Sequence, residues 1–162
     1  MSLGSNLGDR LGNLRAALST LHSHPRLAVR SVSPVYRTEP LTERRQDDFF
    51  NCAIELRTEL TPEELLHVCM DIEVKLGRKR PGRKHSPRPI DLDIVFFGNR
   101  TVATANLKIP HPRYGERKFV LVPLADIAPD FVCPDTGLTV NEALEVCGDG
   151  SRVELVREAE MV

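Results

Sequence analysis

The sequence has no tryptophan, and phenylalanine and tyrosine together make up only 5% of its 162 residues. A protein that binds single-stranded nucleic acid by stacking bases would need more aromatic rings than this. The charges are also balanced, since 22 Lys and Arg residues stand against 23 Asp and Glu residues, for a net charge of −1. We therefore do not expect a generally basic nucleic-acid binder, and we expect no nucleic acid among the partners of this protein.

Long apolar runs are missing as well. No stretch approaches the ~20 apolar residues of a membrane span, and no charged and then apolar leader opens the chain. The length fits one ordinary domain, and a hydrophobic share of 41% can supply a packed core. We expect a single domain over residues 1–162 that works in the cytoplasm, without a membrane.

Cysteine is present but sparse, and its spacing is uninformative. Cys52, Cys69, Cys133 and Cys147 form no C-x-x-C pair and match neither a zinc site nor a redox dithiol. Two of them fall within apolar patterns, where cysteine behaves as a small buried hydrophobe. We expect four reduced thiols.

Hydrophobic periodicity predicts the elements. Leucines at helical spacing indicate a helix over 7–21, and the capping box Thr61-Pro62-Glu63-Glu64 begins a second helix that stops at Gly77. Further short helices are expected over 119–127 and 140–146, and strands over 27–36 (interrupted by Pro34), 50–56, 90–97 and 102–109. Strands and helices in this order favour an α+β sandwich over a regularly alternating parallel sheet.

Asp91-Leu92-Asp93 is the sharpest candidate site. Side chains two apart on a strand share a face, so the two carboxylates stand together opposite a buried apolar face. Two such acids repel each other unless a divalent cation neutralises them, and oxygen ligands at short spacing suit Mg²⁺. The alternative is a solvated strand face whose acids pair with arginines.

A basic stretch leads directly into this pair. Residues 75–88 contain seven Lys or Arg residues and no acid. Guanidinium groups bind phosphate oxygens in pairs, so the stretch suits a polyphosphate next to a metal. The alternatives are an ordinary solvated loop or a nucleic-acid patch.

Other motifs are weaker when taken alone. The loop 4–9 is not a Walker A sequence, and a tight turn in which Asn6 or Asp9 caps the first helix explains it. His111 lies between two prolines beside Arg113, a restrained position that can bind a phosphate or a sugar.

These segments together resemble the 6-hydroxymethyl-7,8-dihydropterin pyrophosphokinases of folate biosynthesis. The resemblance runs in order from about residue 3 to residue 135, and no single motif would establish it. It is carried by LGSNLGD (3–9), SPVYRTEP (33–40), FFN (49–51), SPRPIDLDI (86–94), IPHPR (109–113) and ERKFVL (116–121).

The resemblance implies a ferredoxin-like α+β sandwich, mainly an antiparallel sheet with helices on it. It implies transfer of the β,γ-diphosphate of ATP to the pterin hydroxymethyl group, with release of AMP, and two Mg²⁺ ions held by Asp91 and Asp93. Arg78 and Arg88 match the catalytic positions. The matching ATP-binding positions are Arg78, Arg80, Arg88, Ile94, His111 and Arg117.

The resemblance also implies a pterin site. Phe49 and Phe119 match the rings that stack on the pterin and Asn51 the amide that reads its edge, with Gly4, Thr38 and Leu41 nearby. The loops 39–48 and 78–89 match the family's lids. The expected partners are the two small-molecule substrates, and we expect a monomer.

The chain departs from the family pattern at some positions. Only two residues precede Leu3, where family members usually have several more. His85 stands where some members carry an aromatic that closes over the pterin, and Phe49 where some carry tyrosine. The competing interpretation is a ferredoxin-like ligand-binding or regulatory module without turnover. An RNA-binding α+β domain is a further alternative, disfavoured because acids occupy the candidate sheet face.

Overall fold

The computed structural model describes residues 1–41, 45–79, 86–157 and 161. Among these residues, a six-stranded sheet has the order β5-β1-β4-β3-β8, and β2 also pairs with β4. All of its pairings are antiparallel. The strands are β1 (Ser2–Ser5), β2 (Leu27–Val32), β3 (Tyr36–Thr38), β4 (Phe49–Thr58), β5 (Asp91–Asp93) and β8 (Val153–Leu155).

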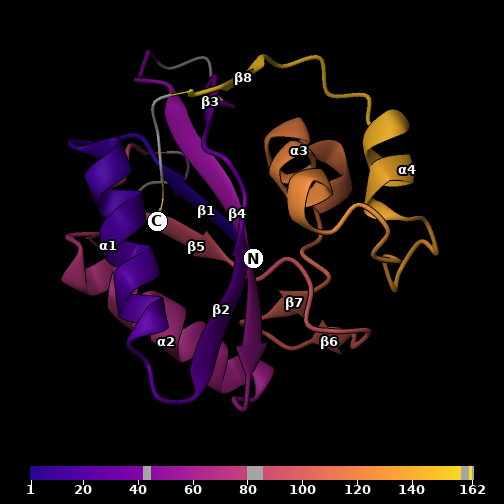
Figure 1. The fold of residues 1–162 in the computed structure, drawn as a ribbon, viewed down its shortest axis with the longest axis horizontal. Coiled ribbons are helices and arrows are strands. Elements are labelled where there is room, and N and C mark those ends of the chain that lie inside the picture. Colours follow the sequence, from indigo (N-terminus) through magenta and orange to yellow (C-terminus); the bar gives the residue numbers. More distant parts are fainter. Residues whose placement is uncertain (42–44, 80–85, 158–160, 162) are drawn as a thin grey trace.

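The long strand β4 organises the sheet because its side chains alternate between two cores. Cys52 and Ile54 belong to the core under one pair of helices, whereas Ala53 belongs to the core on the opposite face. Figure 1 shows the resulting layers, with α1 (Arg10–His22) and α2 (Pro62–Lys75) on one side of the sheet and α3 (Lys118–Ile127) and α4 (Val140–Glu145) on the other. The expected α+β architecture is confirmed.

The helices begin where capping side chains satisfy free backbone amides. The Asp9 carboxylate accepts from the Gly12 amide at 2.9 Å, so Asp9 and not Asn6 caps α1. At α2 the Thr61 hydroxyl accepts from the Glu64 amide at 3.2 Å, and the Glu64 carboxylate accepts from the Thr61 amide at 2.8 Å. The capping box expected from the sequence is confirmed.

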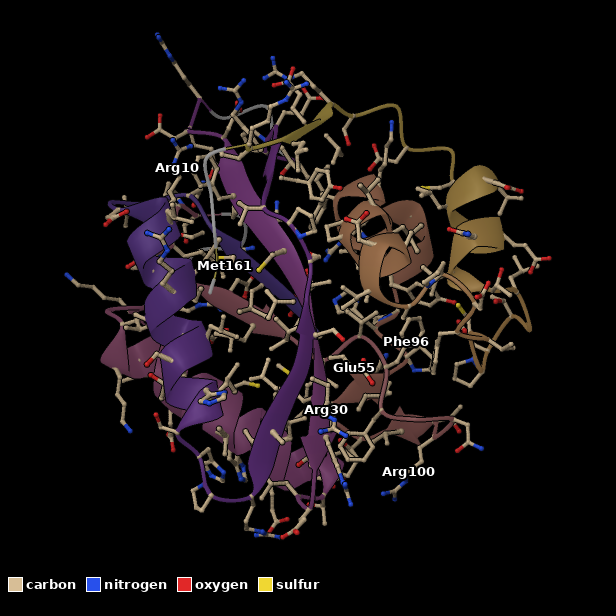
Figure 2. All side chains as sticks on the ribbon, in the orientation of Figure 1. Arg10, Arg30, Glu55, Phe96, Arg100 and Met161 are labelled. Atoms are coloured by element: carbon tan, nitrogen blue, oxygen red, sulfur yellow. The ribbon has the colours of Figure 1, made fainter. Side chains whose placement is uncertain are left out.

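Apolar side chains fill both layers (Figure 2). The core beneath α1 and α2 includes Leu3, Leu14, Leu21, Ile72 and Leu92. On the α3 side, Leu121 and Val140 are buried and the Phe96 ring packs against Tyr114 and Phe131, at centroid distances of 4.8 and 4.9 Å. Within the described part of the chain, no helix has the length and apolar character needed to cross a membrane. All four cysteines are free thiols, as expected.

Three strand predictions need correction. The segment 27–36 is not one strand: β2 ends at Val32 and β3 begins at Tyr36, and Pro34 between them has no amide proton to donate. The segment 90–97 is regular strand only at Asp91–Asp93, since β1 pairs with those three residues and the Val95 carbonyl instead accepts from the His111 amide at 2.9 Å. The segment 102–109 is a small hairpin of β6 (Val102–Ala103) and β7 (Lys108–Ile109), and β8 was not predicted.

Candidate active site

The two acids of the Asp-Leu-Asp motif lie on β5, the edge strand, with Leu92 buried between them. Asp91 is held by two guanidinium groups. Its Oδ1 accepts from Arg78 Nη1 at 2.5 Å, and its Oδ2 accepts from Arg88 Nη2 at 2.7 Å. The interpretation of the motif as acids paired with arginines therefore describes Asp91 in this structure, and it leaves the role of Asp93 open.

Asp93 carries a carboxyl group whose charge is disfavoured. Burial, and then the negative charge of Asp91, raise the pKa of Asp93 from 3.8 to about 6, against the opposing effect of Arg117 and Arg88. A divalent cation would stabilise the ionised form. No cluster of three or more His, Cys, Asp or Glu side chains that could hold a metal occurs among the described residues. A carboxylate pair nevertheless fits Mg²⁺, which keeps several waters and takes further ligands from substrate phosphates.

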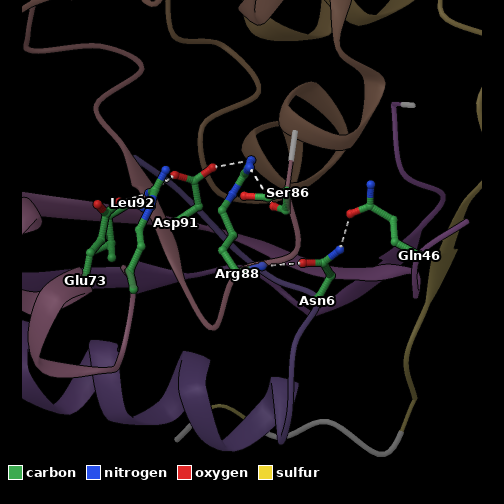
Figure 3. A network of polar contacts seen from close by, with 8 residues as sticks. Asn6, Gln46, Glu73, Ser86, Arg88, Asp91 and Leu92 are labelled. Atoms are coloured by element: carbon green, nitrogen blue, oxygen red, sulfur yellow. Dashed lines mark hydrogen bonds and ion pairs between the residues drawn. The ribbon is translucent and has the colours of Figure 1, made fainter. Parts of the chain in front are cut away.

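A buried amide positions Arg88 from the first loop of the chain. The Arg88 backbone amide donates to the side-chain oxygen Oδ1 of Asn6 at 2.9 Å, and the Asn6 backbone amide donates to the Arg88 carbonyl at 3.2 Å. Asn6 Nδ2 also donates to Gln46 Oε1 at 2.8 Å, so Asn6 joins the loop after β3 to the residues before β5 (Figure 3). The sequence predicts for Asn6 only a turn or capping role, and nothing in it indicates this link.

A cavity of about 60 Å³ opens beside the acids, between β1, β4 and the start of α3. Asn51 Nδ2 donates to Thr38 Oγ1 at 2.6 Å in its buried wall. The Arg88 guanidinium lies 5.4 Å from the Phe49 ring centroid, and Arg117 lies 5.7 Å from that of Phe119. The residues assigned to the pterin all line this cavity: Gly4, Thr38, Leu41, Phe49, Asn51 and Phe119.

Two larger cavities lie on the other side of the acids, toward α2 and the β6–β7 hairpin. The first, of about 400 Å³, is lined by residues that include Arg78, Asp91 and Asp93. The second, of about 310 Å³, is lined by residues that include Asp93, Ile94 and His111. Asp93 lines all three cavities, and Asp91 lines the aromatic cavity and the first of the larger ones. The acids therefore lie between the aromatic cavity and the two larger ones.

Donors around the acids are left without partners. Arg88 Nε and Arg117 Nε are buried and have no hydrogen-bond acceptor among the described residues. Burial and the nearby Arg117 charge lower the pKa of His111, so its imidazole is neutral at pH 7. Buried guanidinium nitrogens that lack acceptors fit an anionic ligand.

The structure thus brings together all the predicted site residues that it describes. Arg80, assigned to ATP, and His85 lie outside the described residues, as do residues 42–44 and 80–85 of the two expected lids. Glu73 was not predicted: it is only 2% exposed on α2 and contacts Arg78. Its position four residues after Cys69, on the apolar face of the helix, is the signal that could have identified it.

Comparison with known proteins identifies the family. A family model described as 7,8-dihydro-6-hydroxymethylpterin-pyrophosphokinase (HPPK) matches residues 1–129. A 2-amino-4-hydroxy-6-hydroxymethyldihydropteridine pyrophosphokinase of Bacillus subtilis is 46% identical over 127 residues, covering 78% of this chain and 75% of that protein. The protein of the same name from Methylorubrum extorquens is 46% identical over 144 residues, 89% of each chain.

A solved structure shares the fold. The crystal structure of an HPPK-DHPS protein in complex with substrates superimposes with a TM-score of 0.67 at 15% sequence identity, covering 89% of this chain and 42% of that one. At this level of identity the likeness concerns the fold alone.

Proposed function

This chain belongs to the 7,8-dihydro-6-hydroxymethylpterin-pyrophosphokinase family, and we propose that it transfers the diphosphate of ATP to 6-hydroxymethyl-7,8-dihydropterin in folate biosynthesis. The pterin hydroxymethyl oxygen attacks the β-phosphorus, the bond from this phosphorus to the α-phosphate oxygen breaks, and AMP leaves. The observation that carries the proposal is the placement of Asp91 and Asp93 between the aromatic cavity and the larger cavities.

The aromatic cavity suits the pterin, a flat heterocycle with a donor and acceptor edge. Phe49 and Phe119 offer rings to its two faces, and the Asn51 amide, fixed by Thr38, can read its edge. Leu41 adds an apolar contact at the rim. These residues hold the hydroxymethyl group toward the acids, and positioning of this kind supplies a large part of the rate.

The larger cavities suit ATP. Ile94 and His111 line the space for the nucleoside, and Arg78, Arg88 and Arg117 surround the acids where the phosphates would lie. The unpartnered Nε–H groups of Arg88 and Arg117 are donors for phosphate oxygens. Cations at this place stabilise the charge that develops on the AMP leaving group. Arg80 keeps its proposed role in ATP binding.

Two Mg²⁺ ions complete the proposal, with Asp91 and Asp93 as their protein ligands. When bound, the ions neutralise the triphosphate and lower the pKa of the attacking hydroxyl. In this structure Arg78 and Arg88 hold both oxygens of Asp91, so Asp91 would exchange part of this pairing for the metal. Arg78 and Arg88 are then the groups nearest to the phosphates. We further propose that the protein acts as a monomer in the cytoplasm.

The test is AMP release from ATP and Mg²⁺, with and without 6-hydroxymethyl-7,8-dihydropterin. We expect pterin-dependent AMP from the protein, and Asp93→Ala to lower kcat/KM by roughly 10²–10⁴-fold. Asp71→Ala, an exposed acid on α2, is the matched control and should retain full activity. Activity that survives Asp93→Ala would refute the metal assignment, and folded protein that releases no AMP would refute the function.

A further inference from the structure

Glu73 is a buried acid that the reaction outlined above does not use. It lies near the end of α2 with a side chain only 3% exposed. A carboxylate buried to this degree is costly unless strong donors satisfy it. Its donors therefore indicate what the group does.

The same oxygen of Glu73 holds two parts of the candidate active site. Oε1 accepts from the Leu92 amide at 2.9 Å and from Arg78 Nη1 at 2.6 Å. Leu92 is the central residue of the Asp-Leu-Asp motif on β5, the edge strand, so its outward amide has no strand to bond among the residues that the structure describes. The Glu73 carboxylate supplies the acceptor that a neighbouring strand would otherwise provide (Figure 3). It thereby fixes the backbone between the two acids.

The charge of Glu73 matters for Arg78 more than for Leu92. A neutral glutamine would also accept from the Leu92 amide, whereas a carboxylate attracts a guanidinium much more strongly. Arg78 Nη1 is shared between Glu73 Oε1 and Asp91 Oδ1, at 2.6 and 2.5 Å. If Asp91 turns toward another cation, Glu73 remains as the anchor that keeps Arg78 at the acids.

We propose that Glu73 is a positioning residue that holds Arg78 at the Asp91–Asp93 pair and fixes the β5 backbone between the two acids. The catalytic consequence rests on the proposed function. Glu73 lines the same cavity as Arg78 and both acids. The charge of Glu73 acts through Arg78, so the effect of neutralising Glu73 disappears when Arg78 is removed.

A double-mutant cycle tests this dependence. We expect Glu73→Gln to lower kcat about tenfold while KM for the pterin changes less than about twofold, because the loss falls on the phosphate side. Glu73→Asp should restore part of the loss, and the control Asp71→Asn, the same charge change on an exposed position of α2, should have no effect. In an Arg78→Ala background, Glu73→Gln should change kcat by less than about twofold. If the double variant loses kcat by the product of the two single-variant losses, the proposal is overturned. A normal kcat for Glu73→Gln would overturn it as well.

A second measurement separates this proposal from the function itself. In the protein without ligands, NMR signals of the Arg78 guanidinium should be sharp and protected from solvent exchange. Glu73→Gln should broaden them or speed their exchange, while Asp71→Asn leaves them unchanged. Unchanged Arg78 signals in Glu73→Gln would refute the positioning role even in an active enzyme. A wild-type protein that shows the expected Arg78 signals but makes no AMP would refute only the proposed function.

Discussion

At Gly4 the backbone of β1 runs directly against the amide that lines the aromatic cavity. A Cβ atom at this position would lie 2.5 Å from Asn51 Oδ1, too close for any carbon to be tolerated. Asn51 cannot simply retreat, because its Nδ2 donates to the buried Thr38 hydroxyl. The absence of a side chain at Gly4 is therefore a condition for the position of Asn51.

Gly4→Ala should displace the Asn51 amide and weaken pterin binding. We expect KM for the pterin to rise at least about tenfold, the effect of one lost buried hydrogen-bonding group. The affinity for a non-hydrolysable ATP analogue should stay within about twofold, because Gly4 does not line the larger cavities. Gly148→Ala, at a glycine with open space around it, is the control. Steady-state kinetics and calorimetry give both values, and equal losses for the two substrates would contradict this assignment.

Single residues also mark the limit of what the sequence could predict. Asp91 and Asp93 were identifiable because alternation on a strand fixes which side chains share a face. The buried position of Glu73 could be inferred from helical spacing, but the bonds of Glu73 and Asn6 could not, because their partners lie far away in the chain: Glu73 bonds to Leu92, and Asn6 to Arg88. Side-chain bonds to backbone atoms of this kind leave no periodic pattern in the sequence.

Among the elements, α2 has the most direct influence on the site. Its capping box fixes where the helix begins, and Glu73 near its other end contacts β5 through the Leu92 amide. Start and end of the helix are linked by the regular helical backbone. The stability of α2 therefore contributes to the folded state that holds Arg78 and the acid pair, although Thr61 does not act on the geometry of the site.

Thr61→Ala should remove one half of the capping box. We expect the free energy of unfolding to fall by about 1 kcal/mol, because the Glu64 amide loses its acceptor. Urea unfolding measures the change. Ser19→Ala, which deletes an exposed hydroxyl from α1, should stay within about 0.5 kcal/mol. An unchanged stability for Thr61→Ala would show that the cap does not stabilise the helix, and kcat per folded molecule should be unaffected in either variant.

Element boundaries were predictable where local chemistry sets them. The start of α2 follows from Thr61 and Glu64, which act on their own backbone. The end of β5 does not, because the apolar residues Ile94 and Val95 follow it without a turn signal, and the ladder ends where β1 no longer offers partners. Strand β8 pairs with β3 from over a hundred residues away, and its short sequence contains no pattern that predicts this contact.

At the scale of the whole molecule, the site forms where several segments distant in the sequence converge. The edge strand β5 and its neighbour β1 lie at the centre of the site. The larger cavities are bordered by α2 and the β6–β7 hairpin, and the aromatic cavity is bordered by β4 and the start of α3. Helices on both faces of the sheet keep that edge in place (Figure 1). Composition and periodicity predicted the α+β class, but only the ordered resemblance to a family predicted which loops would meet.

If diphosphate passes as one unit from ATP to the pterin, a label on the β-phosphorus of ATP must pass with it. ATP labelled at this atom is incubated with the protein, Mg²⁺ and 6-hydroxymethyl-7,8-dihydropterin, and the products are separated. We predict that the label moves to the pterin product while unlabelled AMP forms in equal amount. Label that stays with the nucleotide as ADP would contradict this account.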